Sequence, residues 1–423
     1  MRRPAAPARA RCCGVGGPAA VAGRTVTIRH FDFAVIGGGP AGAAAARRLA
    51  LGGAAVVVFE RQRFPRPKPC GGGLSGRAMR WLDEPLPPDL VDAEIFAGRS
   101  HFGPVSIEVR QDRRVAVLVT RARFDAWLLA RAEAAGAHLE WQEVRDLRVR
   151  PGGIALTAAG DEFVARAAVV GEGANRRFAR AIRGGDSPRH IGFCVEADIP
   201  VPPADPYAHI RDAVDIYFGA PVYGYSWIFH HGSYYSVGVG GLRRWFGEPV
   251  ASFRRFVGER GLTLDGVRAR GHFVPCGGVT RQVAADRVIL AGDAAGWVDP
   301  FQGEGMAYAV RSGQLAAETL LDAARQGDFT SRRLAAYRRR CDDEFGRDLR
   351  AARVIMHIVH RWPSLLLRSP PATERVLGEY LRVPRGDLSY RDFLRWVARR
   401  LPWFVLRTQW RKAAALAGPG GDS

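Results

Sequence analysis

Lysine is almost absent from this chain of 423 residues, which contains only Lys68 and Lys412. The formal net charge is nevertheless +20, because arginine supplies the other basic residues. This balance suggests an anionic partner, such as nucleic acid, a membrane surface or a phosphorylated substrate. The arginines form no block interleaved with aromatic residues, and no zinc-finger spacing occurs. We therefore expect no nucleic-acid partner.

Cysteine is also sparse, and its spacing excludes two classes of site. The six cysteines are Cys12, Cys13, Cys70, Cys194, Cys276 and Cys341. Six in a chain of this length do not form a disulfide framework, and no Cys-x-x-Cys pair occurs. We therefore expect no bound metal and no iron–sulfur cluster, and a reducing cytoplasm is the default compartment.

Long apolar runs are missing too, since none reaches the roughly 18 residues that a membrane-spanning helix needs. Residues 1–29 are rich in Ala, Arg, Gly and Pro and lack the apolar core of a signal peptide. We interpret them as a disordered leader or as an overlong start. The expected protein is cytoplasmic, either free in solution or peripheral on the inner face of the membrane.

The most informative segment is FDFAVIGGGPAGAAAARRLALGGAAVVVFER, residues 31–61. It predicts a buried strand at 31–36, a Gly-x-Gly-x-x-Gly turn, a helix at 43–51 and a second buried strand at 54–59. Such a turn lets a pyrophosphate approach the free N–H groups of the helix, and the acid after the second strand accepts hydrogen bonds from ribose hydroxyls. The residues expected to hold a dinucleotide are Gly37, Gly39, Pro40, Ala41, Gly42, Glu60 and Arg61.

A second strand–loop–helix pattern occupies residues 286–320, DRVILAGDAAGWVDPFQGEGMAYAVRSGQLAAETL. It predicts a short buried strand at 288–291 and a helix from 306 to about 321. The helix again begins at a glycine loop, which suits an anion or an electron-rich ring. The candidate cofactor contacts here are Gly292, Asp293, Pro300, Gly303, Glu304, Gly305 and Met306.

These segments and two motifs between them resemble a flavoprotein superfamily that includes aromatic hydroxylases and geranylgeranyl reductases. TRARFDAWL resembles its R-x-x-F-D-x-x-L element, and VVGEGANRRFAR resembles V-G-A-D-G-A-N-S, with Glu172 in place of aspartate and Arg176 in place of serine. The resemblance implies that FAD is the dinucleotide and that Asp293 binds its ribityl chain. It also implies that Arg121 approaches the flavin or its phosphates.

PRPKPCGGGLSGRAM, residues 65–79, resembles the K-P-C-G-G motif of the geranylgeranyl reductase family, which reduces isolated double bonds of polyprenyl chains. YGYSWIFHHGSYYSVGVGG resembles the family's Y-x-W-x-F-P element, with His230 in place of proline. The alternation of its aromatic residues predicts one face of a strand, which would suit either a sheet core or an apolar substrate groove. The resemblance favours the groove and makes Tyr225 and Trp227 candidate catalytic residues.

The family's chemistry is hydride transfer from reduced FAD to one alkene carbon while an acid protonates the other. NADPH or another reductant would supply the electrons. Cys70 is the candidate acid or gate, although a small buried thiol that only packs under the glycines fits the sequence equally well. Lys68 and Gly71 are candidate cofactor contacts, and Lys68 would pair with a flavin phosphate or with a diphosphate on the substrate.

Two other functions fit parts of the sequence. A flavin monooxygenase or halogenase that acts on an aromatic or polyketide substrate would share the cofactor motifs, but the KPCGG and YxWxF elements argue against it. A basic membrane- or nucleic-acid-binding protein with a structural flavin is the non-enzyme alternative. Purified protein that is yellow and is bleached by NADPH would exclude that alternative.

The predicted fold is mixed α/β, with a Rossmann-like FAD-binding domain at 30–180 and 281–327, a sheet-based substrate domain at 181–280 and a helical region at 328–423. The sequence turns apolar from 354 to 367. A later stripe at helical spacing would cap the substrate groove, lie on a membrane surface or simply pack on the domain. Its members are Phe393, Leu394, Val397, Leu401 and Phe404.

Overall fold

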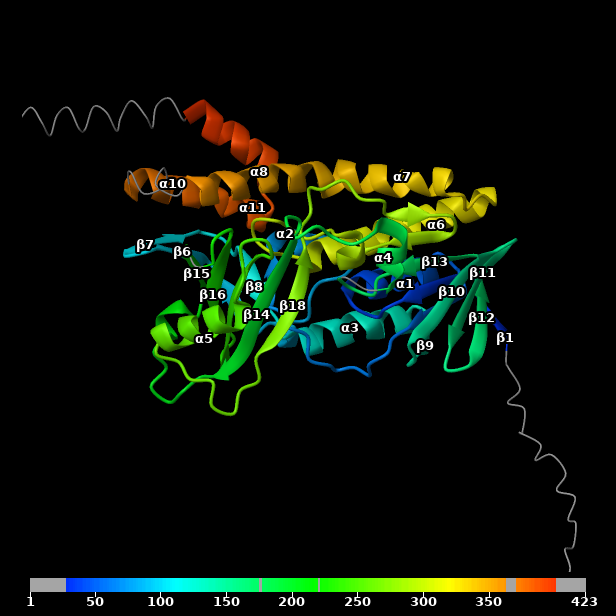
Figure 1. The fold of residues 1–423 in the computed structure, drawn as a ribbon, viewed down its shortest axis with the longest axis horizontal. Coiled ribbons are helices and arrows are strands. Elements are labelled where there is room, and N and C mark those ends of the chain that lie inside the picture. Colours follow the sequence, from blue (N-terminus) through cyan, green and yellow to red (C-terminus); the bar gives the residue numbers. More distant parts are fainter. Residues whose placement is uncertain (1–27, 175–176, 220, 363–369, 401–423) are drawn as a thin grey trace, which may run out of the picture.

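Two sheet-based units lie side by side, and long helices run across the top of both (Figure 1). The computed structural model describes residues 28–174, 177–219, 221–362 and 370–400. A six-stranded sheet forms the centre of one unit, and a seven-stranded sheet forms the other. The predicted mixed α/β architecture is confirmed.

The six-stranded sheet has the order β19-β20-β13-β2-β3-β9, and all neighbouring pairs except β19–β20 are parallel. Its four inner strands are short runs of Val, Ile, Leu, Ala and Phe, because they are covered on both faces. The strands are β2 (Phe33–Ile36), β3 (Val56–Phe59), β9 (His138–Glu140), β13 (Ala167–Val170), β19 (Ala284–Ala285) and β20 (Val288–Leu290).

Helices and a second sheet cover this parallel sheet in one hydrophobic core. The covering sheet has the order β1-β12-β11-β10, and its Phe163 packs edge-on against Phe59 with ring centroids 4.8 Å apart. The covering elements are α1 (Pro40–Leu51), α3 (Arg121–Ala134), α6 (Met306–Gln326), β1 (Ile28–His30), β10 (Val144–Arg150), β11 (Gly153–Ala158) and β12 (Asp161–Ala165).

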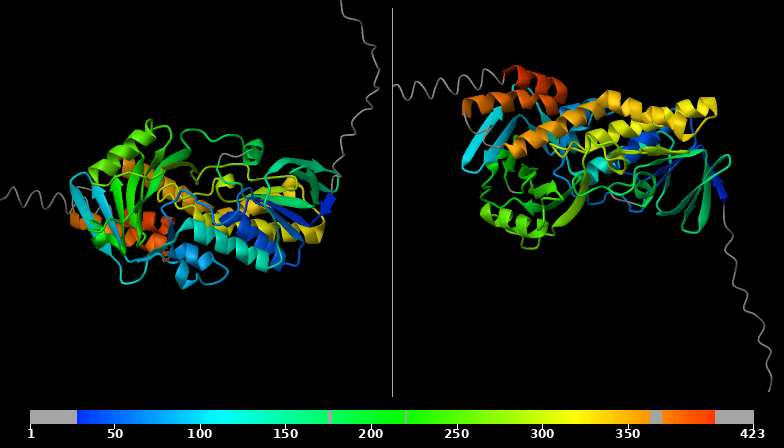
Figure 2. Two further views of the ribbon diagram at one scale, coloured as in Figure 1. Left: turned by 90° about the horizontal axis from the view of Figure 1, so that it is seen from below. Right: turned by 45° about the horizontal axis from the view of Figure 1, so that its top comes forward.

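The seven-stranded sheet has the order β18-β14-β17-β16-β15-β6-β7. It takes β6 and β7 from a segment that precedes the predicted range 181–280 by about eighty residues, and Figure 2 shows these cyan strands at one edge of the green sheet. The strands are β6 (Ala97–Phe102), β7 (Val105–Arg110), β14 (Ile191–Pro200), β15 (Ala213–Phe218), β16 (Gly224–His230), β17 (Tyr234–Leu242) and β18 (Arg270–Pro275). The domain limits themselves stay a prediction.

Small elements connect the two units. A three-stranded sheet of order β4-β8-β5 carries the segment after β3 toward the seven-stranded sheet. The remaining short elements are β4 (Gly73–Ser75), α2 (Gly76–Trp81), η1 (Pro88–Leu90), β5 (Ala93–Ile95), β8 (Ala116–Leu118), α4 (Arg177–Arg183), η2 (Ala208–Ile210), α5 (Pro249–Glu259) and η3 (Gly292–Ala295).

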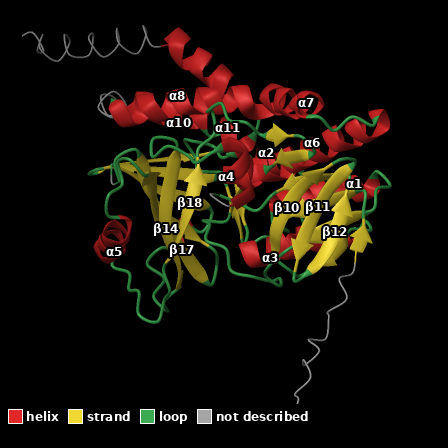
Figure 3. Ribbon diagram, turned by 45° about the vertical axis from the view of Figure 1, so that its right-hand side comes forward, coloured by secondary structure: helices red, strands yellow, loops and turns green. Residues whose placement is uncertain are grey.

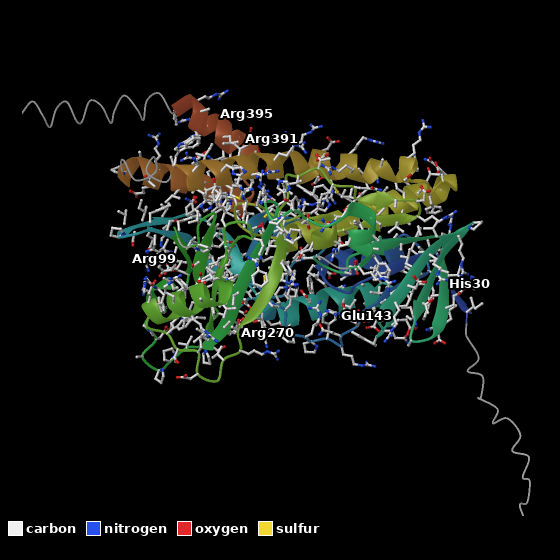
Figure 4. The ribbon with its side chains drawn as sticks, in the orientation of Figure 1. His30, Arg99, Glu143, Arg270, Arg391 and Arg395 are labelled. Atoms are coloured by element: carbon white, nitrogen blue, oxygen red, sulfur yellow. The ribbon has the colours of Figure 1, made fainter. Side chains whose placement is uncertain are left out.

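The helical layer begins with α7 (Ser331–Cys341), which continues through the π-type turn η4 (Asp342–Gly346) into α8 (Arg347–Arg361). Figure 3 shows α8 above the seven-stranded sheet, beside α10 (Pro370–Tyr380) and α11 (Arg382–Arg385). Residues 390–400 form a last helix, on which Figure 4 labels Arg391 and Arg395. Asp348 of α8 accepts the backbone N–H groups of Tyr390 and Arg391, both at 3.1 Å, and so caps that helix.

The predicted elements agree with the structure to within a few residues. The predicted strand at 31–36, helix at 43–51 and strand at 54–59 correspond to β2, α1 and β3, and the later pair corresponds to β20 and α6. The predicted leader, residues 1–29, overlaps the structure at Ile28 and Arg29, which belong to β1. Leu401 and Phe404 of the apolar stripe lie outside the described residues. None of the helices in the described parts of the chain is long and apolar enough to cross a bilayer.

Candidate active site

A cavity of about 820 Å³ lies between the two sheet units. All but two of the twenty residues that the sequence singled out line its wall, although they come from five separate segments of the chain. The exceptions, Gly42 and Gly292, lie directly behind the wall. A Cβ on Gly42 would stand 1.7 Å from the carbonyl oxygen of Gly37, and one on Gly292 would stand 2.9 Å from the Cβ of Ala41. These two glycines therefore allow close backbone packing and leave the contact surface to their neighbours.

The first glycine turn has one open position. Gly37 has a φ of +100°, and a Cβ there would meet the carbonyl of Gly171 at 2.5 Å. At Gly39, by contrast, the nearest atom to an added Cβ is the Arg66 guanidinium at 3.7 Å. The backbone at Gly39 is thus bare toward the cavity at the point where α1 begins, which is the geometry that a pyrophosphate requires. The turn fits FAD on this observation.

Glu60 closes the turn from the end of β3. Its Oε2 accepts the N–H of Gly38 at 2.9 Å, and its Oε1 accepts the N–H of Gln62 at 3.0 Å. Each carboxylate oxygen has a second lone pair, so both can also accept a hydroxyl from the cavity side. Arg61 lines the wall next to it.

A cationic cluster faces the turn from the start of α3. Arg121 holds the fully buried carboxylate of Asp125 through two hydrogen bonds of 2.8 Å, and Arg66 NH1 lies 3.4 Å from the same carboxylate. One carboxylate therefore serves two guanidiniums and leaves one positive charge uncompensated within the cluster. Such a wall suits the phosphates or the electron-rich ring of a flavin. Sequence reasoning missed Arg66 and Asp125, although Asp125 stands inside the R-x-x-F-D motif.

Lys68 continues this cationic wall and contacts a residue that the sequence did not suggest. Its Nζ lies 2.7 Å from Nε2 of His272 on β18, and the same ring nitrogen lies 3.5 Å from Oδ2 of Asp293. Burial lowers the pKa of Lys68 to about 8, and Asp293 opposes that effect. The cavity thus brings together Lys68, His272 and Asp293, which come from three distant segments. Asp293 of the second glycine loop faces the cationic wall.

Two kinds of contact fix the second glycine loop: hydrogen bonds within the loop and contacts with the seven-stranded sheet. Asp299 Oδ1 accepts the N–H groups of Phe301 and Gln302 at 2.8 and 2.9 Å. Gly303 has a φ of +72°, and a Cβ there would stand 2.8 Å from the Tyr225 hydroxyl. Tyr225 donates that hydroxyl to the carbonyl of Gln302, and burial raises the pKa of its phenol above the ordinary value. Pro300, Gly305 and Met306 complete the loop at the start of α6.

Glu304 lies in this loop, and its carboxylate binds the backbone at the end of β4. Its Oε1 accepts the N–H of Ser75 at 3.1 Å, and burial raises its pKa to about 7. The carboxylate therefore ties the second glycine loop to β4, directly after the cysteine–glycine segment. Its role as a cofactor contact stays a prediction.

The Cys70 segment is pressed between the two sheet units. A Cβ on Gly71 would stand 2.9 Å from the Phe229 ring, and one on Gly72 would stand 2.4 Å from the Val119 carbonyl. His231 contacts the carbonyl of Gly71 at 3.2 Å, and the N–H of Gly72 donates to the Cys70 sulfur at 3.4 Å. The glycines are therefore required by space, and the sulfur of Cys70 is held in the cavity wall.

The surroundings of the Cys70 sulfur suit proton transfer. The Arg121 guanidinium lies close enough to the thiol to interact with it electrostatically. A guanidinium beside a sulfur stabilises the thiolate that remains after the proton is given up. Cys194 also lines the cavity, but its thiol donates to the His272 carbonyl at 3.5 Å, and burial raises its pKa to about 12. Of these two thiols, Cys70 is the one placed to act as an acid.

The aromatic side chains of β16, together with Tyr223 just before it, form the cavity wall beside the Cys70 segment. Tyr223, Tyr225, Trp227 and Phe229 all line the cavity, as the alternation predicted. Trp227 lies over Gly238 of β17, where a Cβ would come within 2.1 Å of its ring, and its Nε1 donates to Ser236 Oγ at 3.4 Å. These contacts hold the ring in place in the cavity wall.

The far end of the cavity is apolar and belongs to the helical layer. It is lined from α8, α10, α11 and residues 390–400, with no Asp, Glu, Lys or Arg among the lining residues of these elements as described. They are Ile355, Met356, Ile358, Val359, His360, Val376, Leu377, Tyr380, Leu381, Pro384, Phe393, Leu394 and Val397. The cavity therefore runs from a cationic end at the glycine turns to a hydrocarbon-like end under the helices. Among the described residues no cluster of three or more His, Cys, Asp or Glu could hold a metal ion.

A bare glycine turn, an acid at the end of β3 and a second glycine loop with its aspartate are the features of an FAD-binding oxidoreductase. Residues 30–85 match the FAD binding domain family. The geranylgeranyl diphosphate reductase of rice (Oryza sativa subsp. japonica) is 31% identical over 330 residues, which cover 71% of this chain and 68% of the relative. The chain belongs to the geranylgeranyl reductase family of FAD-dependent oxidoreductases.

Other relatives agree with this assignment. A digeranylgeranylglycerophospholipid reductase of Methanothermobacter thermautotrophicus is 28% identical over 336 residues, which cover 75% of this chain and 85% of the relative. The crystal structure of a geranylgeranyl bacteriochlorophyll reductase-like protein from Thermoplasma acidophilum has a TM-score of 0.74 at 21% identity, over 90% of this chain and 99% of that one. A flavin-dependent brominase shares the fold at a TM-score of 0.64 and 17% identity, over 88% of this chain and 98% of that one.

Proposed function

We propose that the protein is an FAD-dependent, NAD(P)H-driven reductase that saturates isolated C=C bonds of a polyprenyl chain. The proposal rests on one observation above all: a single cavity is lined both by the cationic glycine turns and by the apolar helices, and Cys70 and Trp227 line the same cavity. Relatives named for geranylgeranyl diphosphate and digeranylgeranylglycerophospholipid support the same substrate class.

Different groups of residues would bind the cofactor, bind the substrate and transfer the proton. The turns at Gly39 and Gly303, together with Asp293 and the cationic wall, would hold FAD, which supplies hydride when it is bound and reduced. The apolar helices would hold the prenyl chain and exclude water, which an unactivated alkene requires. Cys70 would give a proton to the second alkene carbon, and Arg121 would stabilise the resulting thiolate.

A monooxygenase or halogenase activity is the alternative to a reductase activity at this site. The brominase shares the fold at 17% identity, and a likeness at that level carries no information on the reaction. The apolar end under α8 and α10 is better suited to a long hydrocarbon than to a small phenol. The monooxygenase or halogenase activity therefore stays the second candidate, without an observation of its own.

The test is an anaerobic incubation of the FAD-loaded, dithionite-reduced protein with geranylgeranyl diphosphate, a prenylated quinone or a prenyl lipid. The expected result is a product heavier by two mass units for each bond reduced, and NADPH should replace dithionite. No mass gain with any prenyl compound, together with an oxygen-dependent product from an aromatic compound, would overturn the proposal in favour of the second candidate.

A further inference from the structure

An exposed apolar surface lies where the apolar end of the cavity approaches the outside. Nine large hydrophobic side chains are exposed among the described residues. Five of them, each between 39% and 55% exposed, lie just before β16, just after β17, on α8 and directly after α8. We call these five the docking face: Val222, Trp245, Val354, Ile358 and Trp362.

Ring contacts join the strand side of the docking face to α8. Tyr223, next to Val222, stacks on Trp245 with centroids 5.5 Å apart, and it also contacts the ring of His360 at 5.4 Å. On α8, Val354 and Ile358 are four residues apart and therefore share one side of the helix. Figure 3 shows α8 at the outer edge of the fold, above the seven-stranded sheet.

The cavity and the docking face share residues. Ile358 lines the apolar end of the cavity and is nevertheless 39% exposed. Tyr223 and His360 also line the cavity and are partly exposed. The apolar end of the cavity therefore meets the surface at the docking face, so a chain that enters there never has to cross the cationic end.

Arginines accompany the two tryptophans of the docking face. The Arg244 guanidinium lies over the Trp245 ring at 5.1 Å, and that of Arg361 lies over Trp362 at 5.9 Å. Both arginines are exposed, and neither has a carboxylate within 4 Å in the parts of the chain that the structure covers. Glu248 is the nearest acid in sequence to Trp245 and is also exposed. Tryptophan, aliphatic side chains and unpaired arginine together are the composition of surfaces that sit at a bilayer interface.

We propose that the docking face seats the protein on the surface of a bilayer that contains anionic lipid. This inference rests on the proposed function, because the polyprenyl chain would then pass from the bilayer past Ile358 into the cavity. A second copy of this chain is less suited to bind the docking face. The protein has a net charge of +20 and the face carries unpaired guanidiniums, so two such faces would repel each other.

The test is co-sedimentation of the FAD-loaded protein with vesicles of phosphatidylcholine, with or without phosphatidylglycerol. We expect binding to the anionic vesicles that weakens as salt rises. The double variant Arg244→Gln/Arg361→Gln should bind roughly thirtyfold more weakly, about fivefold for each arginine. The double variant Trp245→Ser/Trp362→Ser should lose about tenfold or more. The matched control is Leu51→Ser/Val149→Ser, which removes equally exposed side chains from the other unit and should bind like the wild type.

Several outcomes would overturn the inference. The first is that the wild type does not bind anionic vesicles. The second is that the control variant and the tryptophan variant bind vesicles equally well. The third is that the tryptophan variant changes its oligomeric state while its vesicle binding stays the same. Circular dichroism melts would verify that each variant is folded. A parallel assay with a short, water-soluble prenyl diphosphate separates this inference from the proposed function. The tryptophan variant should reduce that substrate at the wild-type rate, whereas a wild type that binds vesicles but reduces no prenyl compound would refute the proposed function alone.

Discussion

The phenol of Tyr225 donates a hydrogen bond to the backbone carbonyl of Gln302, so the aromatic strand β16 touches the second glycine loop directly. The contact joins the unit that would hold the substrate to the loop that would face the flavin. Because the loop contains Gly303, whose missing side chain makes room for the phenol, the position of each part depends on the other.

Removal of this hydroxyl should loosen the loop. Tyr225→Phe is expected to weaken FAD binding about fivefold, which corresponds to the loss of one hydrogen bond of about 1 kcal/mol. Titration of the apoprotein with FAD, followed by flavin fluorescence, measures the effect. Tyr207→Phe is the matched control, because Tyr207 also donates to a backbone carbonyl, that of Arg260, away from the cavity. Equal FAD affinities in both variants would contradict the prediction.

The glycine run after Cys70 offers a comparison between neighbours. Gly71→Ala would put a methyl group 2.9 Å from the Phe229 ring and should cost about 1–3 kcal/mol of stability through overpacking. Gly73→Ala meets the same ring only at 4.0 Å and should be tolerated. Chemical denaturation of both variants, together with their reductase rates, would check the difference. If both behave alike, the run is not held as tightly as the structure indicates.

Cys70 should be required for turnover but not for FAD binding. Replacement of a general acid lowers rates by about a hundredfold to ten-thousandfold, so Cys70→Ser should reduce kcat by at least about a hundredfold. Cys194→Ser, at the other thiol of the same cavity, should retain turnover. Single-turnover oxidation of the reduced flavin by a prenyl substrate is the appropriate measurement. Full turnover by Cys70→Ser would show that this thiol only fills space.

Glu196 should make the stability of the protein depend on pH. Burial raises its pKa to about 7, well above the value of an exposed glutamate, and Asp198 adds to the effect. A carboxyl with a raised pKa in the folded state favours folding below the pKa of the unfolded chain, and this contribution is lost as pH rises through about 7. Urea unfolding at pH 5 and pH 8 should show lower stability at pH 8.

The isosteric variant tests that assignment. Glu196→Gln should reduce this decline and raise stability at pH 8 by about 1–3 kcal/mol, since it removes a buried charge but keeps an acceptor for the Ser236 hydroxyl. Glu248→Gln, at an exposed position, is the control and should leave the pH profile unchanged. The same decline in Glu196→Gln as in the wild type would show that Glu196 is not the group responsible, and a flat wild-type profile would contradict its raised pKa.

The cofactor-binding unit could be predicted from the sequence because its signals are local. A buried strand, a glycine turn and a helix follow one another without a gap between Phe33 and Leu51, and each element has its own composition. The aromatic face of β16 could also be predicted from the sequence, since strand alternation alone places Tyr225 and Trp227 on one side.

The remaining parts of the site depend on contacts between distant segments. His272 meets Lys68 across 204 positions, and no pattern around it distinguishes it from any other histidine on a strand. Arg66 is one of many arginines in the sequence, and only the fold shows that it shares Asp125 with Arg121. The pairing of β6 with β15 likewise has no sequence signal, because their strands are separated by more than a hundred residues.

That pairing has a consequence for how the chain acquires its structure. The strands β6 and β7 are made before β10–β13 of the flavin unit, yet they can complete their sheet only when β15 has followed. Neither unit is a continuous stretch that could be cut out and kept folded. The two halves should therefore melt in one calorimetric transition, and a nick anywhere between residues 111 and 212 would leave two fragments that stay associated until both unfold together.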